Sequence, residues 1–472
     1  MSVIHYPRCA LVLPLLFTLL CPPPAAWALS IGEERLIGQK ILYSVRQELQ
    51  VLDDPDISQY INGLGQQVLK VVGPQYFDYR FFVVRSEQLN AFAAPAGMVF
   101  FYSGLLEAMH NEDELVSVMA HEIGHVVSRH IANRMEKSGK TSVASMILGV
   151  AGLALGVPGL SQGIFTGSLA AGQTANLQYS REDEEQADRL AFGWMVAMRR
   201  NPDSMRAMLQ TLRRVVRYSM GNVPQYLLTH PDPESRIGYV ESLIELNRAK
   251  KPAPVWQQTD DFDFLRIRYR VLAQSPDLAR LRQGCTITLS RDGKSMAGRL
   301  ARYGLALIEA QNRRFDAALA HMDLLQAQFP DRDILHVDRA VILQQAGRYA
   351  EARAILDRQT AKNPNDMYAR FHLAAAEAAL GNTERAALLF QQVARALPEY
   401  PQVYFELGQL ETGRGAAGKG IFYLGKYYLF QGREELAVQN LKRASRDRSL
   451  PETMRKEAGQ ILAGIDKIKK GT

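Results

Sequence analysis

Apolar residues in the first part of the chain follow two different spacings, and each spacing predicts one type of element. Residues 31–49 and 57–72 place them about every 3.6 positions, which predicts two amphipathic helices. Residues 77–84 and 89–102 are rich in aromatic and β-branched residues, and a Pro-Ala-Gly sequence interrupts the second run. We therefore expect a strand followed by a hairpin or a bent edge strand, which together form a small sheet packed against helices.

A third helix is predicted from residue 112. Asn111 is a suitable N-cap, Glu112 to Glu114 place negative charge in the first turn, and residues 115–127 supply an apolar surface at helical spacing. Helical spacing returns at residues 181–199 and again after Pro233.

Residues 141–180 contain no Asp, Glu, Lys or Arg. Within them, residues 143–160 are apolar and close to the length of a transmembrane helix, but Gly and Pro interrupt them. We expect residues 141–171 to form a hydrophobic lid or a wall of the active-site groove. Peripheral contact with a membrane, or insertion into it, is the alternative.

The second half of the chain has a repeat of 34 residues. The repeated positions are Pro330, Pro364 and Pro398 and, in the same period, Ala318, Ala352 and Ala386. A helix-turn-helix unit of this length, with Ala in its second helix and Pro at its end, is typical of tetratricopeptide repeats. Gly432 and Ala437 repeat the offset of Gly381 and Ala386, but 51 residues further on. This is one and a half periods, so we expect one extra helix at 401–414 before the last repeat.

Composition and charge exclude some classes of protein. The chain has 472 residues, 47% of them hydrophobic and 22% charged, with a net charge of +7. Charges of both signs are mixed and no basic tract is interleaved with aromatic residues, so we expect no nucleic-acid partner.

Residues 1–28 are predicted to be a secretory signal peptide. Arg8 precedes an apolar core at 10–20, and Ala26-Trp27-Ala28 forms a small-x-small cleavage site. A lipoprotein signal at Cys21 is the weaker alternative, because Leu20 occupies a position where a small residue is expected. Cleavage would leave Cys285 as the remaining cysteine, so no internal disulfide is expected.

The third helix carries a motif with catalytic chemistry. His121, Glu122 and His125 form an HExxH sequence. Histidines four positions apart lie on one face of a helix, where two neutral imidazoles can bind one Zn²⁺ and leave other coordination positions open. Glu122 lies within reach of a water at such an ion and can take its proton during attack on a peptide carbonyl. The motif predicts a zincin-type metallopeptidase.

A glutamate-type zinc site needs one more ligand from a second helix. Four acids at 182–185 compete for this role. Glu184 lies on the apolar stripe of its helix, whereas its neighbours turn towards solvent, with Asp183 as the second choice. Asp188 lies one turn after Glu184 and could hold the free N–H of a histidine ligand.

Two further residues follow in a Pro-rich loop. His230 is predicted either to donate a hydrogen bond to the oxyanion or to act as an extra metal ligand that closes the site; the alternative is an ordinary turn histidine. Arg236 is expected to pair with the acids of the site or to cap the fold. His130 lies about 140° from His125 on a continuous helix, so we do not expect it to be a ligand.

The chain resembles the gluzincin peptidases related to HtpX and the CAAX prenyl proteases over about residues 31–245. The resemblance is carried by HEIGHVVSRH at 121–130, EEQAD at 184–188 and Thr229-His230-Pro231. The resemblance implies one zinc per chain held by His121, His125 and Glu184, with Glu122 as general base and His230 as a regulator.

The signal peptide and the repeats are similar to the periplasmic branch of that family. This similarity implies a periplasmic enzyme in quality control of outer-membrane proteins. Its partners would be unfolded or misfolded outer-membrane proteins and their insertion machinery.

The expected fold is α+β: a mostly helical metallopeptidase domain with a small sheet, then an all-α repeat solenoid. The expected bounds are 1–28 for the signal peptide, 29–250 for the peptidase, 251–296 for a connector and 297–472 for the repeats. The expected function is zinc-dependent endopeptidase activity in envelope quality control. The alternative is a chaperone or scaffold whose repeats bind unfolded proteins while the peptidase site is latent.

Overall fold

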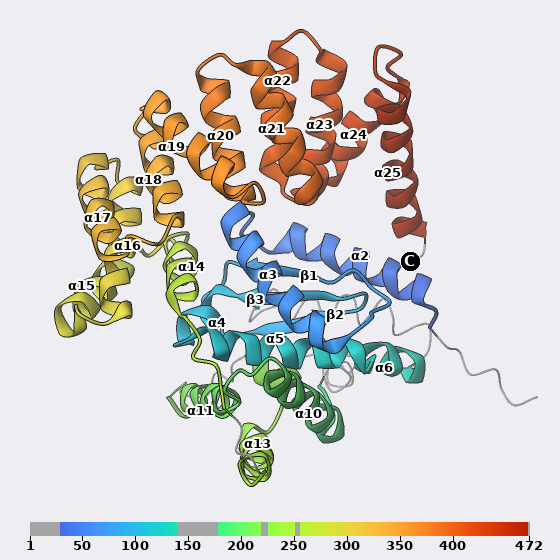
Figure 1. The fold of residues 1–472 in the computed structure, drawn as a ribbon. Helices are drawn as coiled ribbons and strands as arrows, with labels where there is room; N and C mark the ends of the chain where they lie inside the picture. Colours follow the sequence, from blue (N-terminus) through green and yellow to red (C-terminus); the bar gives the residue numbers. More distant parts are fainter. Residues whose placement is uncertain (1–28, 139–177, 219–224, 251–254, 471–472) are drawn as a thin grey trace, which may run out of the picture.

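In a computed structural model, the structure describes residues 29–138, 178–218, 225–250 and 255–470 (Figure 1). The predicted signal peptide at 1–28 and the predicted lid at 141–171 lie outside these residues. Within the described ranges, every helix is too short or too polar to cross a membrane.

The half of the chain that is predicted to be a peptidase, here called the peptidase half, is built on a sheet of three strands, β1 (Arg80–Val84), β2 (Ala91–Ala94) and β3 (Met98–Tyr102), in the order β1-β3-β2. β1 pairs with β3 in parallel, with Arg80 opposite Met98, and β2 pairs with β3 antiparallel, with Ala94 opposite Met98. The predicted hairpin is confirmed, and its turn contains Ala96 and Gly97 at φ 67° and 80°. The predicted first strand begins three residues later than expected, at Arg80.

Both faces of this sheet are buried, because side chains alternate along each strand. One face, with Phe81, Val99 and Phe101, shares a core with α3 (Pro55–Val72) and α5 (Glu112–Val127). The opposite face, with Phe82 and Phe100, packs against α2 (Ile31–Glu48) and α6 (His130–Ser138). The motif helix α5 is therefore held between the sheet and the helices that follow it.

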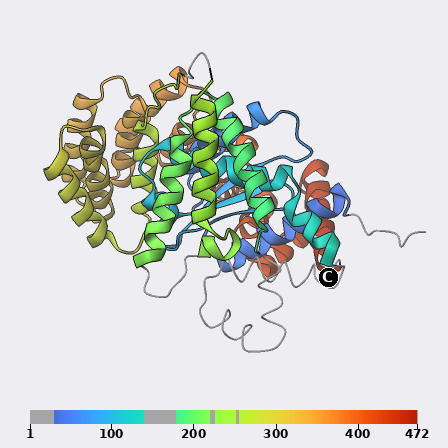
Figure 2. The ribbon, with the colours of Figure 1, turned by 90° about the horizontal axis from the view of Figure 1, so that it is seen from below.

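Further helices complete the peptidase half. They are α4 (Ser103–Ala108), α10 (Arg181–Ala197), α11 (Asp203–Tyr218), α12 (Gln225–Thr229) and α13 (Pro233–Arg248). Helices α10, α11 and α13 lie on the side of α5 that faces away from the sheet (Figures 1 and 2). The predicted helices at 181–199 and after Pro233 are confirmed.

The predicted connector is largely helical. It contains α14 (Phe262–Leu272) and α15 (Leu278–Asp292), and α14 packs against both α3 and the first repeat helix. Arg266 of α14 is 3% exposed and donates hydrogen bonds to Asp56 of α3, at 2.6 and 2.8 Å, and to Asp338 of the repeats, at 3.0 and 3.2 Å. The connector thus joins the two halves through a buried ion-pair network.

The repeats form a solenoid of paired helices. The helices are α16 (Met296–Gln311), α17 (Phe315–Gln328), α18 (Ile334–Gln345), α19 (Tyr349–Lys362), α20 (Met367–Ala379), α21 (Thr383–Ala396), α22 (Pro401–Gly413), α23 (Ala417–Phe430), α24 (Glu434–Arg446) and α25 (Glu452–Lys470).

One detail of the predicted repeats is wrong. A helix does lie at 401–413, but it is not a single extra helix, because α23 pairs with it as in the other units. Gly347, Gly381 and Gly415 lie 34 residues apart and have φ between 77° and 84°, so the period continues through this unit. Gly420 stands where the earlier units carry Ala352 and Ala386, which hid the register from the sequence pattern.

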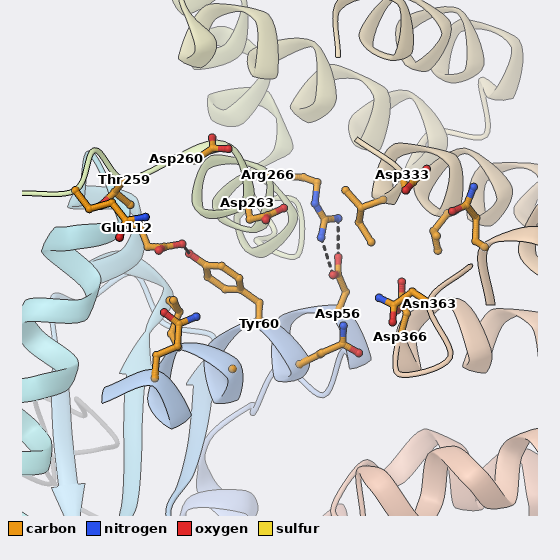
Figure 3. Close-up of a pocket in the computed structure, with 18 of the residues that line it drawn as sticks. Asp56, Tyr60, Glu112, Thr259, Asp260, Asp263, Arg266, Asp333, Asn363 and Asp366 are labelled. Atoms are coloured by element: carbon orange, nitrogen blue, oxygen red, sulfur yellow. Dashed lines mark hydrogen bonds and ion pairs between the residues drawn. The ribbon is translucent and has the colours of Figure 1, made fainter. Parts of the chain in front are cut away.

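The solenoid arches over α2 and α3 (Figure 1). Arg46 of α2 donates to the carbonyl oxygens of Phe430, at 2.5 Å, and Glu399, at 3.2 Å, and Tyr43 donates to Glu434 at 2.5 Å. A cavity of about 760 Å³ remains between α3, α14 and the helices α18 and α19. Its wall is rich in carboxylates, among them Asp263 and Asp366, and the ion pair of Asp56 with Arg266 lies at its floor (Figure 3).

Candidate active site

The motif residues lie on a helix with a well-defined start. The Asn111 side chain accepts a hydrogen bond from the Glu114 backbone N–H at 2.9 Å, which caps α5. The predicted cap and helix are therefore confirmed. His121, Glu122 and His125 are 2%, 0% and 1% exposed, so three ionisable side chains are buried within about one turn.

A second helix crosses α5 at close range. At Gly124, an added Cβ would lie 3.2 Å from the Ala187 Cα of α10, so the two backbones approach more closely than a side chain would allow. This approach brings Glu184 of α10, 2% exposed, to the two histidines. Asp183, the second choice for a ligand, instead completes the capping box of α10 with Ser180.

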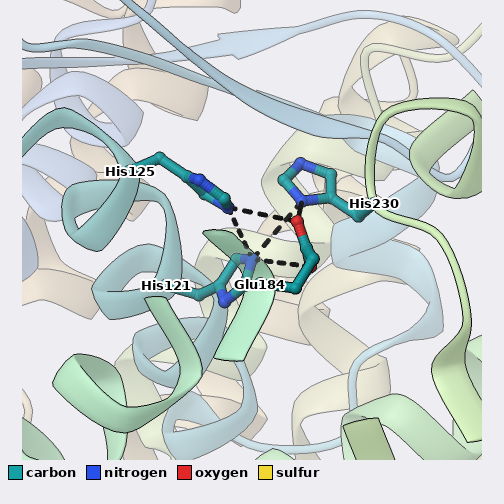
Figure 4. Close-up of side chains that lie close together, drawn as sticks. All are labelled: His121, His125, Glu184 and His230. Atoms are coloured by element: carbon teal, nitrogen blue, oxygen red, sulfur yellow. Dashed lines mark hydrogen bonds and ion pairs between the residues drawn. The ribbon is translucent and has the colours of Figure 1, made fainter. Parts of the chain in front are cut away.

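The structure brings His121, His125, Glu184 and His230 together, with one ligand atom of each within 4.8 Å of the others (Figure 4). The two Nε2 atoms of His121 and His125 lie 3.0 Å apart, and the Glu184 oxygens lie 3.4 and 3.5 Å from them. His230 Nδ1 lies 3.4 Å from His121 Nε2 and 2.9 Å from Glu184 Oε1. Ligands about 2.0–2.1 Å from a tetrahedral ion lie about 3.3 Å apart, so the cluster has the size of such a site.

Asp188 and Arg236 lie directly behind the cluster. Asp188 Oδ1 lies 2.8 Å from His121 Nδ1, which leaves Nε2 of that ring free to face the cluster. Arg236 donates to both oxygens of Asp188 at 2.8 and 2.9 Å and lies 2.8 Å from Glu184 Oε2. Burial and the nearby guanidinium lower the pKa of His121, but the carboxylates of Asp188 and Glu184 outweigh them and raise it to about 9. A metal ion bound at Nε2 would therefore displace a proton from this ring, and Asp188 would keep the other proton on Nδ1.

His130 contacts the other motif histidine. His125 Nδ1 lies 2.8 Å from His130 Nδ1, and His130 Nε2 lies 3.0 Å from Gln186 Oε1. If His125 presents the Nε2 lone pair to a metal, its Nδ1 carries the proton and donates to His130. His130 is then protonated on Nε2 and donates to Gln186, so every donor in this chain has an acceptor. The sequence pattern did not predict this contact.

Two buried tyrosines also line the cluster and were not predicted. The Tyr179 ring stacks on His125 with centroids 3.7 Å apart, and the Tyr226 ring stacks on His230 at 4.3 Å. Tyr179 N–H also donates to the Thr229 carbonyl at 2.8 Å, which joins the start of α10 to the loop that carries His230. The rings fix the planes of the two histidines, but their positions depend on tertiary contacts that sequence spacing does not reveal.

Glu122 is the buried group without a partner at this site. Among the residues that the structure describes, neither of its carboxylate oxygens, nor Nε2 of His230, has a hydrogen-bond partner. His230 Nε2 lies 3.5 Å from Glu122 Oε1, beyond an effective hydrogen bond. A fully buried carboxylate without a partner is costly, which indicates that another group is meant to occupy this space. Together with the size of the ligand cluster, this orphaned carboxylate fits a metal ion and its water.

Comparison with known proteins places both halves of the chain. Peptidase family M48 matches residues 55–244, and the tetratricopeptide repeat matches residues 290–333 and 337–417. These matches agree with the helical peptidase half and with the solenoid described above.

Several curated proteins are similar over much of the chain. The beta-barrel assembly-enhancing protease of Escherichia coli is 29% identical over 396 residues, which cover 76% of this chain and 80% of that protein. The putative beta-barrel assembly-enhancing protease of Vibrio cholerae is 28% identical over 398 residues, covering 76% of this chain and 80% of that protein. The mitochondrial metalloendopeptidase OMA1 of Schizosaccharomyces pombe is 28% identical over 192 residues, covering 41% and 54%.

Proposed function

We propose that this chain is a periplasmic zinc-dependent endopeptidase in quality control of outer-membrane proteins, because residues 55–244 match peptidase family M48 and tetratricopeptide repeats follow them. The observation that carries the proposal is the buried cluster of His121, His125 and Glu184, sized for a tetrahedral ion, with the carboxylate of Glu122 beside it, which has no hydrogen-bond partner among the described residues.

Each residue has a role in this proposal. His121, His125 and Glu184 would hold one zinc ion per chain. When bound, zinc supplies Lewis acidity, which polarises a peptide carbonyl and makes a water molecule more acidic. Glu122 takes the proton of the attacking water and passes it to the leaving amine. Asp188 holds His121 in the tautomer that leaves Nε2 unprotonated.

Arg236 supports the same cluster by charge. Glu184 and Asp188 are two buried carboxylates, and Arg236, 6% exposed, lies within 2.8 Å of each. Burial raises the pKa of Asp188, but Arg236 and His121 lower it to about 2, so the carboxylate stays ionised. Arg236 thus keeps the carboxylates of Glu184 and Asp188 ionised although both are buried.

His230 occupies the fourth corner of the ligand cluster. A catalytic zinc site keeps one coordination position open, whereas a site with four protein ligands is closed. We therefore propose that the geometry described here is a closed state in which His230 holds the place that the attacking water needs. His230 must leave this corner before cleavage, and it can then act as a hydrogen-bond donor to the oxyanion.

The relatives named for assembly of beta-barrels suggest the class of substrate. We propose that misfolded or stalled outer-membrane proteins are the substrates and that the repeats bind them or their insertion machinery. Stacked helix pairs commonly bind extended protein segments on their curved surface. The alternative function, a chaperone or scaffold with a latent peptidase, is favoured by the closed position of His230.

The first test is cleavage of β-casein, an unfolded polypeptide, at equal zinc content. We expect the mature protein to cut it and Glu122→Gln to lose cleavage while keeping zinc. Glu182→Gln, an exposed acid two residues before Glu184, is the matched control and should cut normally. Full activity of Glu122→Gln would refute the proposed mechanism.

His230→Ala in the same assay separates the two roles of that residue. Faster cleavage would mean that His230 mainly holds the site closed, and slower cleavage would mean that its role in the transition state dominates. If wild type, Glu122→Gln and His230→Ala all fail to cut, and Glu122→Gln still rescues outer-membrane assembly in cells, the chaperone function is the better explanation. Release of the mature protein from membranes by carbonate would exclude insertion through residues 141–171.

A further inference from the structure

The backbone of Leu29 lies inside a cluster of charged side chains. Its side chain is 3% exposed and packs in the core formed by α2, α6 and one face of the sheet. Its N–H donates to Glu136 Oε1 at 2.8 Å, and its carbonyl accepts from Arg129 Nη2 at 2.7 Å. Residue 29 is therefore fixed by three independent contacts at the point where α2, α5 and α6 meet.

The charges of this cluster do not balance. Arg129 Nε donates to Glu34 Oε1 at 2.7 Å, and Arg129 Nη2 lies 3.6 Å from Glu136 Oε1. The side chains of Glu34 and Glu136 are 3% and 25% exposed, so both carboxylates are largely shielded from water. Among the described side chains, one guanidinium thus serves two carboxylates. Burial raises the pKa of Glu34 even with Arg129 present, which agrees with a shortage of positive charge.

The carboxylate of Glu136 points at the backbone nitrogen that signal cleavage would free. In the uncut chain this nitrogen is a neutral amide. We propose that cleavage after Ala28 turns it into an α-ammonium group that pairs with Glu136, so that the cluster is completed only in the processed protein. This inference rests on the signal peptide in the proposed function, but it does not depend on peptidase activity.

The ion pair would brace the end of the motif helix. Arg129 has φ 53° and joins α5 to α6, and α6 begins with His130, which contacts His125. A charged hydrogen bond is roughly twice as strong as a neutral one. The processed N-terminus therefore holds α6 against α2 more firmly than the amide of the precursor does.

The pH dependence of this effect has a defined sign. The groups that face the new amine are Glu34 on α2, Glu136 on α6 and Arg129 between α5 and α6. An α-amino group normally titrates at a pKa of about 7.7–8.0, and pairing with Glu136 would raise that value. The ion pair thus stabilises the folded protein fully below the ordinary pKa of the amine in the unfolded chain. This stabilisation is lost as the pH rises through the higher pKa of the amine in the folded protein.

The test compares two forms of the protein that begins at Leu29, one with a free amine and one with an acetylated amine. Each is made as wild type, as Glu136→Gln and as Glu48→Gln. Gln at position 136 keeps an acceptor but removes the charge, and Glu48, exposed at the far end of α2, is the matched control. The readouts are the apparent unfolding temperature between pH 6.5 and 10 and hydrogen exchange of residues 130–138.

We expect acetylation to lower the unfolding temperature of wild type and Glu48→Gln by about 1–2 °C at pH 6.5 and to speed exchange in α6. Glu136→Gln should show neither effect, and the difference should disappear towards pH 10. Equal effects of acetylation in all three proteins, or none in wild type, would overturn the proposal. So would an exported protein whose first residue, found by mass spectrometry, is not Leu29. Casein cleavage by wild type and Glu122→Gln is measured separately, so failure of this proposal is distinguishable from failure of the proposed peptidase function.

Discussion

Replacing His130 tests whether the hydrogen-bond chain behind the ligand cluster supports metal binding. His130→Ala removes the acceptor that the structure gives to His125 Nδ1, at 2.8 Å, in a site where His125 is 1% exposed. A buried donor left without a partner costs about 1–3 kcal/mol. Loss of the group that orients a metal-binding histidine typically costs about 10–100-fold in affinity, or about 1.4–2.7 kcal/mol. The two ranges overlap, so we expect zinc to bind about 10–100-fold more weakly.

The assay is the zinc dissociation constant, measured by competition with a chromogenic chelator on protein that circular dichroism shows to be folded. His130→Asn is the rescue variant, because its side-chain oxygen can take the place of Nδ1 and should restore most of the affinity. His110→Ala is the matched control, since that ring is 68% exposed and its Nδ1 lies 3.5 Å from Glu114 in the first turn of α5, away from the ligand cluster. A dissociation constant of His130→Ala within twofold of wild type would refute the support that we assign to this residue.

Three further predictions concern buried contacts of the two halves. Arg266→Met removes the nearer of two cations from the buried carboxylates of Asp56 and Asp338, and leaves them with Arg270 at 3.4 Å from each. It should lower the free energy of unfolding in urea by about 3 kcal/mol, the lower end of the cost of breaking a buried ion pair. Arg339→Met, on a solvent-exposed pair, should cost less than about 1 kcal/mol, and equal losses would contradict the buried network. Gly124→Val should separate α5 from α10 and abolish stoichiometric zinc in equilibrium dialysis; normal zinc content would show that the helices tolerate a wider spacing. Asp188→Ala should weaken zinc binding by about 10–100-fold, and unchanged affinity would mean that His121 needs no fixed tautomer.

The parts of the site that could be predicted depend on local sequence. The acidic first turn and the helical spacing of α5 lie within 16 consecutive residues, and the N-cap directly precedes them, so the motif helix was predictable. Glu184 could be selected from four neighbouring acids because its position on the apolar stripe of α10 is a property of one helix. In both cases the periodicity of a single element was sufficient.

His130 shows why the rest could not be predicted. The expected rotation of about 140° from His125 assumes one continuous helix. The helix instead ends at Val127, and Arg129 takes a left-handed backbone conformation with φ 53° before α6 begins. A non-glycine residue at positive φ is uncommon, and the sequence Ser128-Arg129-His130 contains no Gly that would indicate it. Because of this break, His130 lies next to the His125 ring, whereas on a continuous helix it would point away from that ring.

The relation between the two halves was also hidden from the sequence. Spacing predicted the solenoid and the peptidase separately, and residues 251–296 were expected to be only a connector. Arg266 lies within that segment, yet it pairs with residues 210 positions before it and 72 positions after it. Pairings of this kind leave no periodic signal, because each partner sits singly on its own helix.

The arch of repeats over α2 and α3 has a consequence for the order of folding. Tyr43 finds its partner Glu434 only 391 positions later, and Arg46 binds the Phe430 carbonyl 384 positions later. Because the chain is synthesised from its N-terminus, the first helices of the peptidase can form long before the segment that covers them has been made. Contacts this distant in sequence slow folding, although the entropic cost of closing such a loop grows only slowly with its length. The outer side of the peptidase thus stays exposed until the last repeats arrive, and their docking is the step that buries it.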